Sequence, residues 1–257
     1  MMSFSITRGR VLLALGAALL TATMFGERSV FANSCSSNGC SINYYGHINI
    51  VNNWWGVNGS GTSGSQDVWT GNTSYGYSWG STYNWSAGNS QYGVKTYAEA
   101  ADGWAYNGFN GAPFPIELTN SSASAWTGIT NTYAGGGSYD VIWDSFYNYS
   151  SNPGSASPQA ELEVWTTASF SNFGYSYRRN VDGWTWDVSI NRGGSWPIIT
   201  YVPETYVSSE NINMMDISRD AVQIGYLNQY MYLLDIDYGI EVYYGSGNLT
   251  VGTYYAP

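Results

Sequence analysis

Short apolar or aromatic runs alternate with turn-forming clusters along most of the chain. The clusters are rich in glycine, serine, asparagine and proline, as at 58–61, 135–137 and 151–154. Many short strands at such spacing are typical of a β-sandwich or barrel, so we expect an all-β domain. The expected strands are 47–52, 67–70, 76–85, 92–100, 115–119, 125–132, 138–147, 160–168, 184–190, 197–202, 230–238 and 248–254.

Two stretches depart from this alternation. Apolar residues recur near helical spacing between Asp216 and Leu227, which predicts one short amphipathic helix packed outside the sheets. Residues 33–42 are rich in serine, asparagine and glycine, and we expect them to form a loosely held arm.

One strand near the middle of the chain has two chemically different faces. In an extended conformation, Glu161, Glu163 and Trp165 share one face, while Leu162 and Val164 share the other. The apolar face can pack into a core. Two neighbouring carboxylates repel each other on an ordinary sheet surface, but together with an indole they suit a carbohydrate cleft.

A strand near the C-terminus repeats the pattern, with Asp235, Asp237 and Glu241 on one side and apolar residues on the other. If both strands lie in one sheet with their acidic faces together, Glu161 and Glu241 would flank a sugar as the carboxylate pair of a glycosidase. The distance between the two carboxyl groups, which separates retaining from inverting enzymes, cannot be read from the sequence.

The N-terminus has the pattern of a secretory signal. Arg8 and Arg10 precede an apolar run over 11–25, and small residues follow; the run is short for a membrane span. We expect a signal peptide at 1–32 and a single catalytic domain at 33–257. The mature protein would be secreted and extracellular, with no membrane association after cleavage.

Composition narrows the class of partner. The formal net charge of −10 becomes about −12 once the signal is removed, which argues against nucleic acid as a partner. Abundant tyrosine, tryptophan, glycine, serine and asparagine fit a binder of neutral polysaccharide, although many extracellular β-proteins share this composition.

Cysteine and histidine are scarce. Cys35 and Cys40 are the only cysteines, and in an exported protein we expect them to form a disulfide. His47 is the only histidine, no nucleophile-elbow motif accompanies any serine, and no metal-ligand cluster or nucleotide fingerprint is present. We therefore expect no metal and no cofactor.

Several blocks, in order, resemble glycoside hydrolase family 12. Asn-Asn-Trp-Trp-Gly at 52–56 looks like the family's N-terminal motif, and Gly-Val-Lys-Thr-Tyr-Ala at 93–98 resembles its Val-Lys-Ser-Tyr strand. Glu-Leu-Glu-Val-Trp at 161–165 is similar to the block that carries the nucleophile, and Tyr-Gly-Ile-Glu at 238–241 to the block that carries the acid/base. The matches extend over nearly all of 44–256.

The resemblance implies a β-jelly roll of two curved antiparallel sheets, with a cleft on the concave face. It also implies hydrolysis of internal β-1,4-glucosidic bonds with retention of configuration, in which Glu161 is the nucleophile and Glu241 the general acid and base. Asp140 would lie against the nucleophile. Trp55 and Trp165 would stack on sugar rings, and Asn53 would bind a sugar hydroxyl.

The chain also departs from the family pattern. Glu163 stands where the family usually has methionine, so we expect it to bind substrate or tune pKa values. The cleft would then hold six carboxyl groups: Asp140, Glu161, Glu163, Asp235, Asp237 and Glu241. The usual Gly-Pro-Ile-Gly segment after the nucleophile strand is replaced by Ser-Phe-Ser-Asn-Phe-Gly at 169–174.

Two other functions fit the same sequence. One is a xylanase similar to glycoside hydrolase family 11, which shares the jelly roll and the paired glutamates. The other is a carbohydrate-binding jelly-roll protein without catalysis. If the protein is a β-1,4-glucanase, we expect a β-glucan as its partner and a monomeric state. The sequence leaves open whether the glucan is cellulose-like, mixed-linkage or xyloglucan.

Overall fold

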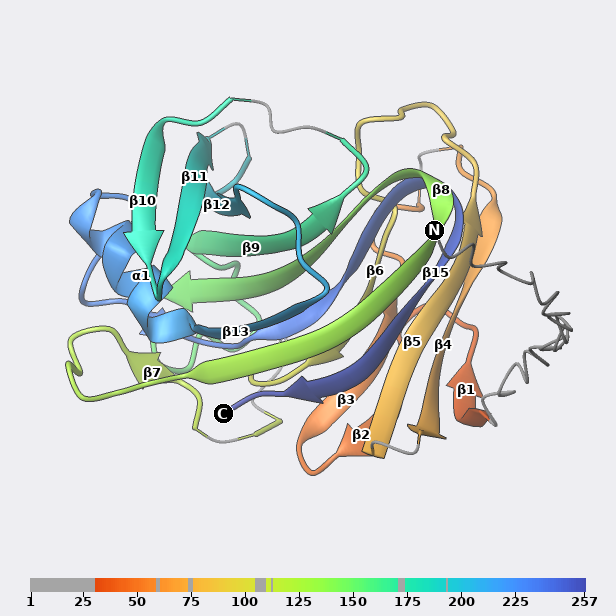
Figure 1. The fold of residues 1–257 in the computed structure, drawn as a ribbon, viewed down its shortest axis with the longest axis horizontal. Coiled ribbons are helices and arrows are strands. Elements are labelled where there is room, and N and C mark those ends of the chain that lie inside the picture. The colour runs from red at the N-terminus through yellow and green to blue at the C-terminus, as the bar shows by residue number, and fades with distance from the viewer. Residues whose placement is uncertain are drawn as a thin grey trace, which may run out of the picture.

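The computed structural model describes residues 31–58, 61–73, 76–104, 110–111, 113–170, 174–192 and 194–257. Almost all of the expected signal peptide lies outside these residues. The described chain forms fifteen strands and one helix, α1 (Met214–Gln223), and the strands build two curved layers (Figure 1). The predicted jelly-roll fold is confirmed. The strands are β1 (Phe31–Cys35), β2 (Cys40–Tyr45), β3 (Ile48–Asn53), β4 (Gly64–Thr73), β5 (Gly76–Trp85), β6 (Thr96–Ala101), β7 (Ile116–Glu117), β8 (Trp126–Asn148), β9 (Ala160–Ala168), β10 (Tyr177–Val181), β11 (Trp184–Asn191), β12 (Ile198–Pro203), β13 (Ser209–Asn213), β14 (Tyr232–Leu233) and β15 (Asp237–Tyr255).

Two long strands, β8 and β15, hold the layers together. They pair with each other and take part in both layers (Figure 1). The inner layer runs β2-β3-β6-β15-β8-β9-β12-β11-β10, and the outer layer runs β1-β4-β5-β15-β8-β13. All these pairs are antiparallel except β9 with β12, which is parallel. This pair departs from the wholly antiparallel sheets that were expected.

Glycines let β8 and β15 bend without ending. The cluster at 135–137 was predicted to be a turn between two strands, but β8 continues through it without a break. A Cβ on Gly135 would collide with the backbone of Gly247, and one on Gly137 would collide with the carbonyl of Tyr244. The glycines are therefore needed for close approach of two bent backbones.

The expected loose arm at 33–42 is wrong. β1 pairs with β4, and β2 pairs with β3, so most of this segment is part of the sheets. The predicted disulfide is confirmed, and it joins the end of β1 to the start of β2 through Cys35 and Cys40. Backbone hydrogen bonds to neighbouring strands outweigh the turn-like composition here.

Strand alternation decides which side chains enter the core between the layers. Leu162 and Val164 of β9 and Tyr238 and Ile240 of β15 are fully buried there, together with Trp143 of β8. Each large apolar side chain buried in this way contributes roughly 1.5–3 kcal/mol. The opposite faces of the same strands therefore point away from the core, along the inner layer.

The predicted helix exists but begins and ends earlier than 216–227. Asn213 is the N-cap, because its side chain accepts a hydrogen bond from the backbone N–H of Met215. Arg179 of β10 binds Asp220 of the helix through a 2.6 Å ion pair. Over the part of the chain that the structure describes, no helix is long and apolar enough to cross a membrane.

Candidate active site

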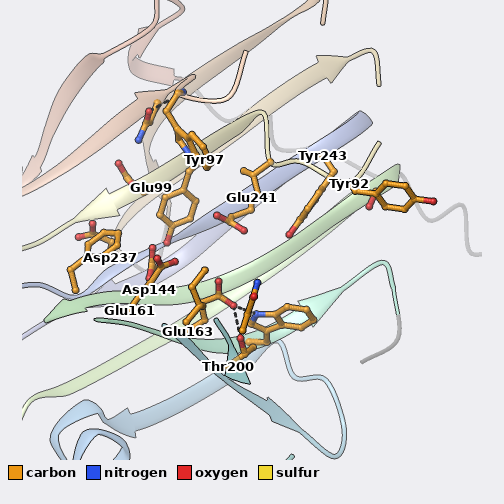
Figure 2. Close-up of a pocket in the computed structure, with 18 of the residues that line it drawn as sticks. Tyr92, Tyr97, Glu99, Asp144, Glu161, Glu163, Thr200, Asp237, Glu241 and Tyr243 are labelled. Carbon is orange, nitrogen blue, oxygen red and sulfur yellow. Dashed lines mark hydrogen bonds between the residues drawn. The ribbon is translucent and has the colours of Figure 1, made fainter. Parts of the chain in front are cut away.

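A cleft of about 1390 Å³ lies along the inner layer. Its lining comes from β3, β6, β8, β9, β11, β12 and β15, together with connecting loops. Figure 2 shows carboxyl groups converging from several strands. The carboxyl-bearing residues in the lining are Glu99, Asp144, Glu161, Glu163, Asp237 and Glu241.

Strand β9 has the two faces that the sequence predicts. Because Leu162 and Val164 enter the core, Glu161, Glu163 and Trp165 all line the cleft. On β15, Asp237 and Glu241 likewise line the cleft, since the residues between them that alternate with this face are buried in the core. The two acidic faces meet in one cleft, as the sequence predicted.

Glu161 is held by an aromatic donor that the sequence argument missed. Trp196, in the loop between β11 and β12, donates from Nε1 to Glu161 Oε2 at 2.6 Å. Burial raises the pKa of Glu161 to about 8 and the charge of Glu163 adds to this rise, while the hydrogen bond from Trp196 opposes it. Trp196 lies in a loop without strand periodicity, so no pattern marked it.

Glu163 is fixed by two donors. Trp165 Nε1 donates to Glu163 Oε2 at 2.9 Å, and Thr200 Oγ1 donates to the same oxygen at 3.0 Å (Figure 2). Burial raises the pKa of Glu163, and both hydrogen bonds oppose the rise. The side chain is therefore held in one orientation beside the cleft, with its charged form supported.

Glu241 lines the same cleft, in surroundings that favour its protonated form. Burial raises the pKa of Glu241 well above its usual range, and the charges of Asp140, Glu163 and Glu161 raise it further. Glu161 has a hydrogen-bond donor that favours its ionised form. Environments of this kind push the pKa values of two carboxyls apart, so that one is acid while the other is ionised.

The expectation that Asp140 lies against Glu161 is wrong. Asp140 pairs with Ala168, at the far end of β9, and accepts a hydrogen bond from Tyr243 at 3.2 Å. Asp144 is the aspartate near Glu161. Burial raises the pKa of Asp144, and the charge of Glu161 raises it further. Both aspartates share one face of β8, and the resemblance to the family pattern had pointed to Asp140.

The expected set of six cleft carboxyls is wrong in two members. Asp235 is fully buried away from the cleft and accepts a hydrogen bond from the backbone N–H of Phe146 at 2.7 Å. Asp140 is also outside the lining. Glu99 and Asp144 line the cleft in their place, and both lie within strands that the sequence predicted without assigning them a role.

The expected sugar-binding residues all line the cleft but differ in exposure. Trp55 is 61% exposed, and its backbone N–H donates to the Asn53 side chain at 3.2 Å. Asn53 also makes a side-chain hydrogen bond to Glu99. Trp165 is only 2% exposed and packs edge-on against Phe170 at 5.4 Å, so its ring has little surface left for a sugar.

Other features bear on the class of site. Tyr92, which the sequence argument did not single out, is 83% exposed in the cleft lining. His47 pairs with buried Asp102 at 3.2 Å instead of facing the cleft. Within the described ranges, no group of three or more histidine, cysteine, aspartate or glutamate side chains is arranged to hold a metal ion.

Curated relatives are xyloglucan-degrading enzymes. A xyloglucan-specific endo-β-1,4-glucanase A from Emericella nidulans is 27% identical over 221 residues, which cover 81% of this chain and 84% of the relative. A probable enzyme of the same name from Aspergillus terreus is 26% identical over 221 residues, covering 81% of each chain. No protein-family model matches the sequence.

Solved structures share the fold. A family 12 xyloglucanase from Bacillus licheniformis, in complex with ligand, superposes with a TM-score of 0.78 at 22% identity, covering 88% of this chain and 99% of the other. Endoglucanase 3 from Trichoderma harzianum, of family 12, gives a TM-score of 0.74 at 22% identity, covering 88% and 96%. Together with the sequence motifs and the two acidic faces in one cleft, these similarities support the resemblance of the chain to glycoside hydrolase family 12.

Proposed function

We propose that this protein is a secreted, endo-acting β-1,4-glucanase that cleaves internal glucosidic bonds by a retaining double displacement. Glu161 would be the nucleophile and Glu241 the general acid and base. The observation that carries the proposal is that both carboxyls line one cleft, where Trp196 donates a hydrogen bond to Glu161 and burial raises the pKa of Glu241.

In the first step, the ionised carboxylate of Glu161 attacks the anomeric carbon. Glu241, protonated, gives its proton to the leaving glycosidic oxygen, and a covalent glycosyl-enzyme forms. In the second step, Glu241, now ionised, takes a proton from water as that water attacks the anomeric carbon. The bond to Glu161 breaks, and the sugar leaves with its original configuration.

Neighbouring residues would orient the pair and the substrate. Trp196 positions Glu161 and favours its ionised form, because an indole N–H can donate but not accept. Glu163 tunes the pKa values of both catalytic carboxyls through its charge. Trp55 offers an exposed ring for stacking on a sugar face, and Asn53 a polar group beside it.

The substrate is a β-glucan with a β-1,4-linked backbone. The curated relatives are named for xyloglucan, so xyloglucan joins cellulose-like and mixed-linkage glucans as a candidate. The signal peptide at 1–32, a single catalytic domain at 33–257, an extracellular location and a monomeric state belong to the same proposal.

The test is a panel of polysaccharides with matched variants. Purified mature protein is incubated with barley mixed-linkage β-glucan, carboxymethylcellulose, xyloglucan and xylan, and reducing ends are measured. We expect glucan cleavage that falls by at least about 10³-fold in Glu161→Gln and Glu241→Gln. Cleavage of xylan alone would instead support the hypothesis of a xylanase. Binding without cleavage would support a carbohydrate-binding protein.

A further inference from the structure

The cleft contains more carboxyl groups than a two-carboxyl mechanism uses. Asp144 of β8 and Asp237 of β15 are direct partners across their ladder. Glu99 of β6 stands opposite Gly239, which is two residues from Asp237 on β15. Such diagonal neighbours lie roughly 7–8 Å apart between Cα atoms. The three carboxyls, here called the acidic triplet, therefore share one part of the cleft floor (Figure 2).

The acidic triplet has no cationic side chain beside it in the described part of the cleft. The lining contains no lysine, arginine or histidine. The described cations have other partners: Lys95 binds backbone carbonyls, Arg178 binds Asp187 and Glu204, Arg179 binds Asp220, Arg192 lies over Tyr226, Arg219 binds Asp216, and His47 pairs with Asp102. No cationic side chain among the described residues therefore balances the negative charge of carboxylates in the cleft.

Two buried polar atoms in the same place lack a hydrogen-bond partner. They are Asp144 Oδ1 and the Tyr97 hydroxyl, and each side chain lines the cleft while being only 4% exposed. A buried polar atom left unpaired costs about 1–3 kcal/mol, so such atoms mark places where a ligand group completes the bonding. An ionised carboxylate can only accept, and so it requires a donor.

We propose that Glu99, Asp144 and Asp237 bind the ammonium group of a β-1,4-linked amino sugar, and that the protein cleaves chitosan as well as neutral glucan. This rests on the proposed glucanase function, since glucosamine polymers have the same linkage as cellulose, with an ammonium in place of the 2-hydroxyl. An ammonium offers several donors and a positive charge. The bond broken and the addition of water are those of the glucanase reaction.

Binding of the ammonium is coupled to loss of protons from the triplet. Burial raises the pKa of Glu99 to about 8, and burial raises the pKa values of Asp144 and Asp237 well above their usual range. A nearby cation favours the ionised forms, so binding of an amino sugar in its ammonium form releases protons from the triplet. The other titratable groups around the triplet, which also share its protons, are Tyr97, Asp102, Glu161, Glu163, Asp235 and Glu241.

The experiment compares two polymers on four proteins. Reducing ends from fully deacetylated chitosan and from barley β-glucan are measured at pH 5.5 for wild type, Glu99→Gln, Asp237→Asn and Glu117→Gln. Glu117 is exposed on β7, outside the cleft, and serves as the matched control. We expect wild type and Glu117→Gln to cleave both polymers, and the ratio of chitosan to glucan cleavage to fall at least fivefold in the other two variants.

A binding measurement separates recognition from turnover. Calorimetry of glucosamine tetramer with Glu241→Gln at pH 5, where the amine is protonated, in two buffers of different ionisation enthalpy, is expected to detect binding with proton release. Glucan cleavage without chitosan cleavage or tetramer binding would overturn this inference and leave the glucanase proposal standing. Chitosan cleavage with an unchanged ratio in both variants would overturn the assignment to the triplet. Folded protein inactive on every polymer would overturn the proposed function itself.

Discussion

Trp196 Nε1 donates a 2.6 Å hydrogen bond to Glu161 Oε2, which links a loop between β11 and β12 to a carboxylate on β9. The indole N–H is a donor only, so the bond is strongest when Glu161 is ionised. The loop thereby fixes the oxygen position of the proposed nucleophile and lowers the pKa of that carboxyl relative to what burial alone gives.

Replacing Trp196 by phenylalanine removes the donor while keeping an aromatic ring. A hydrogen bond to a charged group contributes about 1.5–3 kcal/mol, so we expect kcat to fall by about tenfold or more, with a smaller change in KM. The pKa of Glu161 should rise, which moves the acidic limb of the pH–rate profile to higher pH. The control is Trp126→Phe, because Trp126 lies outside the cleft lining. An acidic limb that stays in place in Trp196→Phe would contradict the positioning role.

Glu163→Gln tests the third carboxyl of the catalytic region. The charge of Glu163 raises the pKa values of both Glu161 and Glu241, so its removal should move both limbs of the pH–rate profile to lower pH. Gln keeps an oxygen that can accept from Trp165 and Thr200, so substantial activity should remain. If activity is lost as completely as in Glu161→Gln, then Glu163 has a catalytic role that this account does not give it.

The two tryptophans predicted to stack on sugar should behave differently. Trp55 is largely exposed in the cleft, and Trp55→Ala should raise KM by several-fold to tenfold, because an aromatic contact contributes about 0.5–1.5 kcal/mol beyond burial. Trp165 is buried and donates to Glu163, so Trp165→Phe should change the pH–rate profile more than KM. Steady-state kinetics over a pH series separates the two cases. Equal KM effects without a pH shift would count against the distinction.

The free energy of unfolding should decrease as pH rises, because buried carboxyl groups with raised pKa values lie both in the cleft and outside it. Glu210 of β13 is 4% exposed and both of its carboxyl oxygens lack partners. Burial raises the pKa of Glu210 from its usual value of 4.5 to about 8. Since the folded value exceeds the unfolded one, the stabilisation by the protonated form is complete below about 4.5 and is lost as pH rises through about 8.

Glu210→Gln should flatten that decline. We expect the Tm at pH 8 to rise by about 3 °C or more, and the Tm at pH 4 to change little, because one pKa unit corresponds to about 1.4 kcal/mol. Exposed Glu117→Gln is the matched control and should shift neither value. Thermal denaturation of the three proteins at both pH values is the measurement. An equal Tm gain at pH 4 and pH 8 would show that repacking, and not ionisation, is responsible.

Strand alternation was sufficient to predict the faces of β9 and β15, because one face of each is packed in the core. It therefore placed Glu161, Glu163 and Glu241 in the cleft. Alternation gives no register between strands, however. The resemblance to the family pattern therefore assigned Asp140 to the nucleophile without a register to check it, whereas the β8–β9 pairing puts Asp144 opposite Glu163, two residues from Glu161.

Local composition failed where tertiary contacts override it. Glycines at 135–137 indicated a turn, but they allow close approach of β8 to β15. Residues 33–42 indicated a loose arm, but they pair with β3 and β4. Trp196 is a loop residue whose role depends on a single long-range contact, and neither periodicity nor a local motif marks such a contact.

The central claim is that Glu161 is the nucleophile of a retaining glucanase. The most direct measurement is to trap the glycosyl-enzyme with an activated 2-deoxy-2-fluoro cellobioside and to locate the label by peptide mass spectrometry. A retaining enzyme accumulates a covalent intermediate on its nucleophile. The account predicts one fluoroglycosyl group, attached to Glu161. Attachment to Glu163, or no covalent adduct on a protein that cleaves glucan, would contradict it.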